Sequence, residues 1–110
     1  MQQPVVRVSI KRCAPEKFAE FQRMMAEVEA ALRPGIEAMP GLIDFYVGAD
    51  QATSSLSQVS TWQTLDDAKQ LDTFQPMLDS GKVFVQKGAT FERPIMNYAT
   101  LWRIRGSAST

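Results

Sequence analysis

The apolar residues of this chain change their period in a fixed order, and this order limits the folds that the chain can form. Residues 5–12 alternate between apolar and polar side chains, which predicts a half-buried strand. Residues 15–32 then repeat apolar side chains at steps of three and four, which predicts a helix with one buried stripe. Pro15 suits the first turn of such a helix, and Glu16 complements its dipole. The stripe consists of Phe18, Phe21, Met25, Val28 and Leu32.

The middle of the chain predicts the end of this helix and then a hairpin. Pro34 is expected to break or kink the helix, and a short helical turn is expected over 35–39 before Pro40-Gly41 stops it. An alternating strand, a small polar loop and a second alternating strand follow, antiparallel to each other, over 42–49, 48–55 and 56–62.

The last part of the chain repeats the order of helix and strand. Thr64 with Asp67 resembles a capping box and starts the second helix. Pro76 is expected to interrupt this helix, and a second helical piece closes at Gly88. Residues 95–104 predict the final strand, and residues 105–110 a frayed tail.

Strand-helix-strand followed by strand-helix-strand predicts an α+β, ferredoxin-like split β-α-β repeat. Its four-stranded antiparallel sheet carries both helices on one face. We expect one domain over 1–110, with its core in 5–104, because 110 residues leave no room for a second domain. A chain this short buries a modest share of its surface alone, so oligomerisation is a natural way to enlarge the core.

Strand alternation divides the predicted sheet into two faces. The face expected against the helices is aliphatic with one Phe, and comprises Val6, Val8, Ile10, Ile43, Phe45, Val47, Val59, Ile95, Ala99 and Leu101. The other face holds both tyrosines and both tryptophans, and comprises Arg7, Ser9, Leu42, Asp44, Tyr46, Gln58, Ser60, Trp62, Met96, Tyr98, Thr100 and Trp102.

Large aromatic side chains on a face that the helices do not reach would form a large exposed apolar patch in a monomer. We therefore expect a homodimer that packs sheet against sheet. Polar groups such as Arg7, Asp44 and Ser60 lie among the aromatic ones, so this face is expected to enclose a mixed cavity. Such a cavity suits a flat phenolic or polycyclic ligand.

Composition excludes several chemistries and partners. The chain has no His and a single Cys, Cys13, so a Ser-His-Asp or Cys-His nucleophile, a His-containing metal site and an internal disulfide are excluded. We expect no metal and no cofactor. Lys and Arg balance Asp and Glu, which argues against nucleic acid, and no apolar run is long enough to cross a membrane. With one thiol and no secretory signal, the cytoplasm is the expected location.

Three segments resemble the antibiotic biosynthesis monooxygenase-like family of the dimeric α+β barrel superfamily. These are Pro40-Gly41-Leu42 followed by Tyr46, Trp62-Gln63-Thr64 before an acidic helix start, and residues 88–94 before the last strand. The resemblance covers residues 5–104. It implies a dimer of ferredoxin-like domains. The family that it resembles includes cofactor-independent monooxygenases acting on anthrone-like polyketides and quinols, haem-degrading enzymes, and members with no established activity.

The resemblance also implies site residues. Trp62 matches the Trp that ends the third strand and lines the active cavity in characterised members. The helix His of the haem-degrading branch is missing here. Two branches also have an Asn on a strand, and the first strand of this chain has Arg7 or Ser9 instead. Asn97 is expected on the helix side of the sheet.

The implied function is oxidation of a small phenolic, quinol or polyketide-type substrate by dioxygen without a cofactor, because an electron-rich phenolate or enolate can itself reduce dioxygen. Arg7 would stabilise the oxyanion and Asp44 would act as the base. The remaining substrate contacts would come from Trp62, Tyr46, Tyr98, Trp102, Met96 and Ser60.

Each of these residues also has a purely structural interpretation. The aromatic side chains would then pack in the dimer interface, Arg7 and Asp44 would form an ion pair, and Cys13 would be a passive small residue. Two alternative functions accompany that interpretation: a non-catalytic homodimer that binds a small aromatic or apolar ligand, and a purely structural or regulatory dimer.

Overall fold

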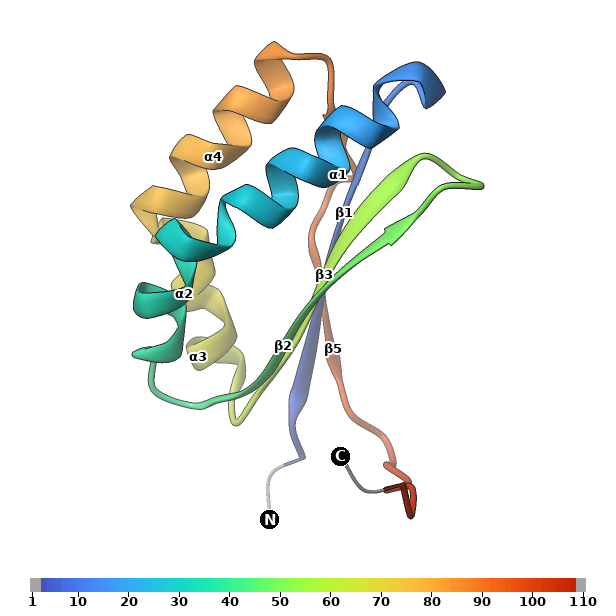
Figure 1. The fold of residues 1–110 in the computed structure, drawn as a ribbon. Coiled ribbons are helices and arrows are strands. Elements are labelled where there is room, and N and C mark those ends of the chain that lie inside the picture. Colours follow the sequence, from blue (N-terminus) through green and yellow to red (C-terminus); the bar gives the residue numbers. More distant parts are fainter. Residues whose placement is uncertain (1–2, 109–110) are drawn as a thin grey trace.

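The computed structural model describes residues 3–108 and has two layers, a twisted antiparallel sheet and a layer of helices on one side of it (Figure 1). The opposite side of the sheet is bare. The α+β, ferredoxin-like order predicted from the sequence is confirmed. The strands are β1 (Val5–Arg12), β2 (Leu42–Asp50), β3 (Ser55–Trp62), β4 (Thr90–Phe91) and β5 (Met96–Ala99). The helices are η1 (Pro15–Lys17), α1 (Phe18–Glu27), α2 (Glu29–Glu37), α3 (Leu65–Ala68), η2 (Lys69–Thr73) and α4 (Gln75–Gln86).

β1 is the central strand of the sheet. It pairs with β3 along one edge, and β3 in turn pairs with β2. The other edge of β1 is shared between β4, which covers its end at Lys11 and Arg12, and β5, which covers its beginning from Val5 to Val8. Within the described part of the chain, no helix is long and apolar enough to cross a membrane.

The first helical segment is interrupted at Val28 instead of Pro34. The chain changes direction between α1 and α2 at Val28, and Pro34 lies inside α2 (Figure 1). Proline has no N–H to donate to the carbonyl of Ala30, but Pro34 and Ala30 are both exposed, so water can hydrate that carbonyl. The predicted break at Pro34 is therefore wrong.

The start and end signals of the second helical segment are confirmed. The Thr64 side chain accepts a hydrogen bond from the backbone N–H of Asp67, which caps α3. Pro76 lies in the first turn of α4, and Gly88 follows this helix with a φ of 110°.

Two clusters of buried side chains join the layers. One surrounds Trp62 and contains Val5, Leu32, Ile36, Ala68 and Leu71. The other contains Phe18, Phe21, Met25, Leu56, Phe84 and Ala89. In the second cluster, the rings of Phe21 and Phe84 meet edge to face with their centroids 5.6 Å apart, which ties α1 to α4.

The predicted faces of β1 and β3 are reversed. The buried residues of these strands are Val5, Arg7, Lys11, Leu56, Ser60 and Trp62, and they face the helices. The register pairs them across the two strands, Val5 with Trp62, Arg7 with Ser60 and Lys11 with Leu56. Ser9 and Gln58 lie opposite each other on the same face, whereas Val6, Val8, Ile10 and Val59 lie on the bare face. Alternation groups residues correctly here, but each group lies on the face opposite to the predicted one.

In β2 and β5 most of the predicted faces are correct. Phe45 and Val47 face the helices, and Asp44 and Tyr46 the bare side, because Phe45 lies opposite Ser60 and Tyr46 opposite Val59. Leu42 pairs with Trp62 and so faces the helices, against the prediction, because Ile43 is an extra residue that bulges out of the register. In β5, Ala99 lies opposite Val5 on the helix side, and Met96 and Tyr98 lie opposite Val8 and Val6 on the bare side.

The last strand is shorter than predicted. β5 ends at Ala99, and the N–H of Thr100 bonds to the carbonyl of Pro4, just before β1 begins. Residues 101–104 therefore extend past the start of their neighbouring strand. Leu101, Trp102 and Ile104 are consequently more than 70% exposed, and the second half of the predicted strand 95–104 pairs with no strand among residues 3–108.

Candidate functional site

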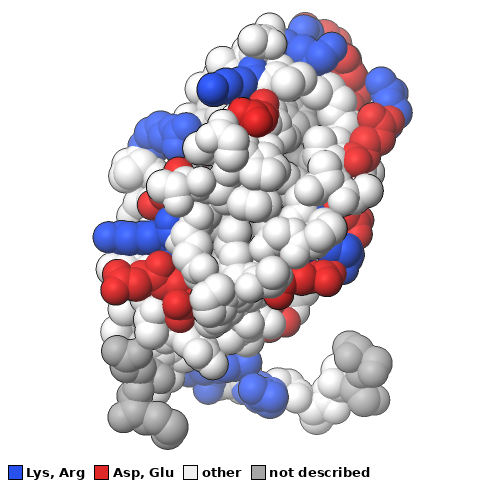
Figure 2. All heavy atoms as spheres, turned by 90° about the vertical axis from the view of Figure 1, so that its left-hand side faces the viewer, with Lys and Arg blue, Asp and Glu red and all other residues white. Residues whose placement is uncertain are grey.

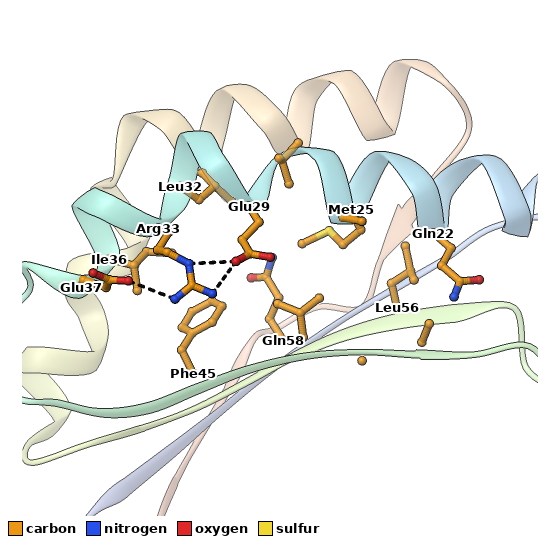
Figure 3. A pocket seen from close by; sticks show the side chains of 15 residues that line it. Gln22, Met25, Glu29, Leu32, Arg33, Ile36, Glu37, Phe45, Leu56 and Gln58 are labelled. Atoms are coloured by element: carbon orange, nitrogen blue, oxygen red, sulfur yellow. Dashed lines mark hydrogen bonds and ion pairs between the residues drawn. The ribbon is translucent and has the colours of Figure 1, made fainter.

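Two cavities lie between the helices and the sheet. The first, which we call the α2 cavity, has a volume of about 570 Å³ and lies between α1, α2 and the hairpin of β2 and β3 (Figure 3). The second, which we call the α4 cavity, has a volume of about 640 Å³ and lies between β1, β4, η2 and α4. Leu32 and Gln58 contribute to the walls of both. Each volume is in the range of small-molecule sites.

The α2 cavity has an apolar floor and a charged mouth. Phe45 points up from β2, while Arg33 on α2 pairs with Glu29 and Glu37 at the mouth (Figure 3). The pKa of Arg33 is raised by its hydrogen bonds to Glu29 and Glu37. All three side chains are exposed and already pair with one another, so this mouth offers no free charge to a ligand.

The α4 cavity is lined by the polar face of β1. Arg7, Ser9 and Lys11 follow one another at steps of two residues, so they project from one face of the strand under α4 and η2. Figure 2 shows the helical layer that covers this space, with charged side chains mainly along its margins. The apolar part of the wall includes Leu71, Met77, Leu78, Phe91 and Ile95.

Arg7 is the most buried charged group of the α4 cavity. Its side chain is 5% exposed, and its Nη2 donates to Oδ1 of Asp72 at 2.7 Å. The Asp72 side chain is half exposed. Nη1 of Arg7 is fully buried and has no hydrogen-bond partner among the described residues. A buried donor without an acceptor is costly, so an oxygen atom that reached Nη1 would lower that cost.

Lys11 lies further along β1 in the same cavity. The residue is 5% exposed, and its Nζ is 4.4 Å from the centre of the Phe84 ring and 5.3 Å from that of Phe91. Within residues 3–108, Lys11 forms no salt bridge with a carboxylate. Burial lowers the pKa of Lys11 to about 8.

Trp62 and Ser60 lie below the helices with Arg7 but belong to the core. The indole Nε1 of Trp62 donates to Oγ of Ser60 at 2.8 Å, and the Trp62 side chain is fully buried. Trp62 lines neither cavity. It shares a core cluster with Leu32 and Leu71, which are part of the wall of the α4 cavity, so it contributes to that wall from behind.

The other predicted site residues lie elsewhere. Asp44, Tyr46, Met96 and Tyr98 are on the bare face of the sheet. Trp102 lies beyond β5 and is 74% exposed. The predicted single site is therefore divided: Arg7, Ser60 and Trp62 lie on one side of the sheet, and Asp44 with the tyrosines on the other. The ion pair considered between Arg7 and Asp44 does not form within the chain, and Arg7 pairs with Asp72 instead.

The sequence interpretation missed Lys11 and Asp72 as cavity residues. Lys11 shares the alternation of Arg7 and Ser9, and this pattern was sufficient to group the three residues. Asp72 carries no comparable signal, since it comes from η2, 65 residues away from Arg7, and only the packing of η2 on the sheet brings the two together.

Comparison with known proteins gives matches of structure alone. No protein-family model and no curated protein matches the sequence. A "putative antibiotic biosynthesis monooxygenase" from Deinococcus radiodurans matches with a TM-score of 0.71 at 13% identity, over 94% of this chain and 99% of that one. A protein of the same description from Nitrosomonas europaea matches with a TM-score of 0.67 at 14% identity, over 93% and 94%.

SnoaB, a cofactor-independent oxygenase from Streptomyces nogalater, has the same fold. Its TM-score is 0.60 at 15% identity, over 94% of this chain and 99% of SnoaB. The resemblance seen in the sequence is thus confirmed at the level of the fold.

Proposed function

We propose that this protein binds a small phenolic, quinol or polyketide-type aromatic molecule in the α4 cavity and oxidises it with dioxygen without a cofactor. The observation that carries the proposal is Arg7, a buried cation whose Nη1 has no hydrogen-bond partner in the described part of the chain and which lines a cavity of suitable size. The likeness in fold to SnoaB, a cofactor-independent oxygenase, supports the same reaction class.

The role of Arg7 follows from the chemistry of such a reaction. A substrate CH₂ or phenol loses a proton to water, and a CH carbon of the resulting anion adds to dioxygen, whose outer oxygen takes up a proton to give a hydroperoxide. The hydroperoxide loses water and leaves a carbonyl, so one oxygen atom enters the product and the other enters water. Arg7 Nη1 would donate to the substrate oxyanion, which lowers the pKa of the substrate and favours its ionisation. Trp62 and Ser60 would hold the wall behind it.

We propose further that a second copy of the chain covers the bare face of the sheet. Tyr46 is 62% exposed there, Tyr98 51% and Met96 42%, which is a large apolar surface for an isolated chain. Residues 101–104 extend beyond β1 with exposed apolar side chains and pair with no described strand, so a strand of the second copy would continue the sheet there. Tyr46, Tyr98, Met96 and Trp102 would then be interface residues, and Asp44 would lie at the interface.

Oxygen consumption by metal-stripped protein tests the proposed oxidation. The substrates are a panel of anthrones, hydroquinones and catechols, and the variant is Arg7→Met. Arg12→Met is the matched control, because Arg12 is on the same strand but half exposed and paired with Glu92 outside the cavity. We expect uptake by the native protein and by Arg12→Met, and a loss of about a hundredfold in Arg7→Met, as on removal of one oxyanion donor. Equal uptake by all three proteins would refute the role of Arg7.

A non-catalytic binding protein is the second candidate. Asp44, the predicted base, lies on the opposite face of the sheet, so it cannot remove a proton from a ligand beside Arg7. Binding of an aromatic ligand in the α4 cavity, followed by titration calorimetry, with no oxygen uptake over the panel would favour this candidate.

A further inference from the structure

We propose that the ligand of the α4 cavity is an aromatic acid, with its reacting oxygen at Arg7 and a carboxylate at Lys11. The inference rests on the proposed function for the reacting end of the molecule only. The carboxylate end follows from the charge and burial of the cavity wall.

The wall of the α4 cavity is strongly basic in a chain that is neutral as a whole. Lys and Arg equal Asp and Glu over the full sequence, at 12 each. The α4 cavity nevertheless has four basic residues and one acidic residue in its wall: Arg7, Lys11, Lys82, Arg93 and Asp72. Asp72 already accepts from Arg7. The remaining positive charge has no counter-ion in the wall, so the cavity favours an anion.

Lys11 marks where the anion would lie. Its ammonium group is buried against the rings of Phe84 and Phe91, and no described carboxylate pairs with it. Ring faces offset only part of the cost of removing an ammonium group from water. The lowered pKa of Lys11 is a sign of that uncompensated cost. A ligand carboxylate would give the ammonium group the partner that the chain does not provide.

The distance between the two cations sets the size of the ligand. Arg7 and Lys11 are four residues apart on one strand, so their Cα atoms are about 13 Å apart at a rise of about 3.3 Å per residue. Arg7 is held at Asp72 and Lys11 at the two rings, so a ligand that meets both cations at this spacing would be longer than a single small anion. An elongated bicyclic or tricyclic acid is such a ligand, and the apolar wall between the two cations, including Leu71 and Ile95, would contact its rings.

Titration calorimetry with three probes tests this inference. The probes are 6-hydroxy-2-naphthoate, which has an oxygen at one end and a carboxylate at the other, its neutral carboxamide, and 2-naphthol. We expect the naphthoate to bind about tenfold or more tightly than the carboxamide, as for a charge-assisted hydrogen bond. In Lys11→Met the preference should fall to less than threefold, with the affinity for the carboxamide unchanged.

Lys87→Met is the matched control. Lys87 follows α4, pairs with Glu20 on the surface and lies outside the cavity wall, so its loss should leave the preference intact. Equal binding of naphthoate and carboxamide, a preference that persists in Lys11→Met, or no binding of any probe would overturn the inference. Thermal melting of both variants shows whether they are folded.

The outcomes separate this inference from the proposed oxidation. A carboxylate preference that depends on Lys11, in a protein that consumes no oxygen with any substrate, supports the acidic ligand and refutes the oxygenase. Oxygen uptake that depends on Arg7, without a preference for acids over amides, supports the oxygenase and refutes the acidic ligand.

Discussion

Arg7 on β1 and Asp72 on η2 form a salt bridge 2.7 Å long between a buried guanidinium and a half-exposed carboxylate, across 65 residues of sequence. This contact ties the central strand to the segment between α3 and α4. The contact uses only Nη2 of the guanidinium, and Nη1 is buried without a hydrogen-bond partner among the described residues.

Asp72→Asn should therefore destabilise the fold more than the loss of a surface pair. Removal of the carboxylate leaves the buried Arg7 charge without its partner, and we expect a loss of about 1–3 kcal/mol in the free energy of unfolding. Glu92→Gln is the control, because its pair with Arg12 is about half exposed on both sides and is worth about 0–1 kcal/mol. Urea denaturation measures both variants, and equal losses would contradict this ranking.

Lys11→Met should stabilise the protein at pH 7. The substitution keeps an apolar stem among Phe84 and Phe91 and removes a charge whose burial is costly. The shift of the Lys11 pKa from 10.5 to about 8 sets an upper bound of about 3 kcal/mol, and ring contacts reduce the gain, so we expect about 1–2 kcal/mol. A loss of stability in urea denaturation would contradict the cost assigned to Lys11.

The same shift predicts a pH dependence with a definite sign. The unfolded chain keeps the Lys11 proton up to pH 10.5, whereas the folded protein releases it near pH 8. The unfolded state thus binds more protons in this window, so the contribution of Lys11 to the free energy of unfolding rises from pH 8 to 10.5. The other charged groups of this cavity are the same in the native protein and in Lys11→Met, so they contribute equally to both. They are Arg7, Asp72, Lys82 and Arg93. The difference in the free energy of unfolding between the native protein and Lys11→Met, measured by urea denaturation, should therefore shrink between pH 8 and 10.5. A constant difference would contradict this prediction.

Trp62→Phe should lower stability without removing the α4 cavity. The variant loses the hydrogen bond from Nε1 to Ser60 and part of the buried ring, at a cost of about 1–3 kcal/mol. Ser60→Ala removes the same hydrogen bond, so the double variant should cost less than the sum of the two single ones. Additive losses would show that the two side chains are not coupled. If Trp62 supports the wall from behind, the affinity of the naphthoate probe changes less in Trp62→Phe than in Lys11→Met.

Tyr98→Asp should convert the proposed dimer to a monomer. Tyr98 lies on the bare face, where a carboxylate would be buried without a partner if a second copy packs there. Val83→Asp is the control, since Val83 is exposed on α4 on the opposite side of the molecule. Light scattering at micromolar concentration should give a dimer for the native protein and for Val83→Asp. A native monomer would contradict the dimer.

Local signals in the sequence were sufficient for most elements. β1 has the predicted bounds because its alternation is uninterrupted from Val5 to Arg12. Thr64 and Gly88 mark the start and end of the second helical segment because a cap and a left-handed residue act over a few residues of chain. By contrast, β5 ends at Ala99 because its neighbour begins at Val5, and no residue of 95–104 carries that information.

Which side chains share a face follows from the alternation along each strand, whereas which face the helices cover depends on how the whole chain packs. Arg7 and Ser9 share a face as predicted, and Lys11 continues the same alternation, because alternation in a strand depends on the backbone alone. Their polarity favoured the bare side, but the helices pack over them and leave the cavity that these cations line. Burial of Arg7 requires the carboxylate of Asp72 nearby, and only the packing of η2 on the sheet brings it there.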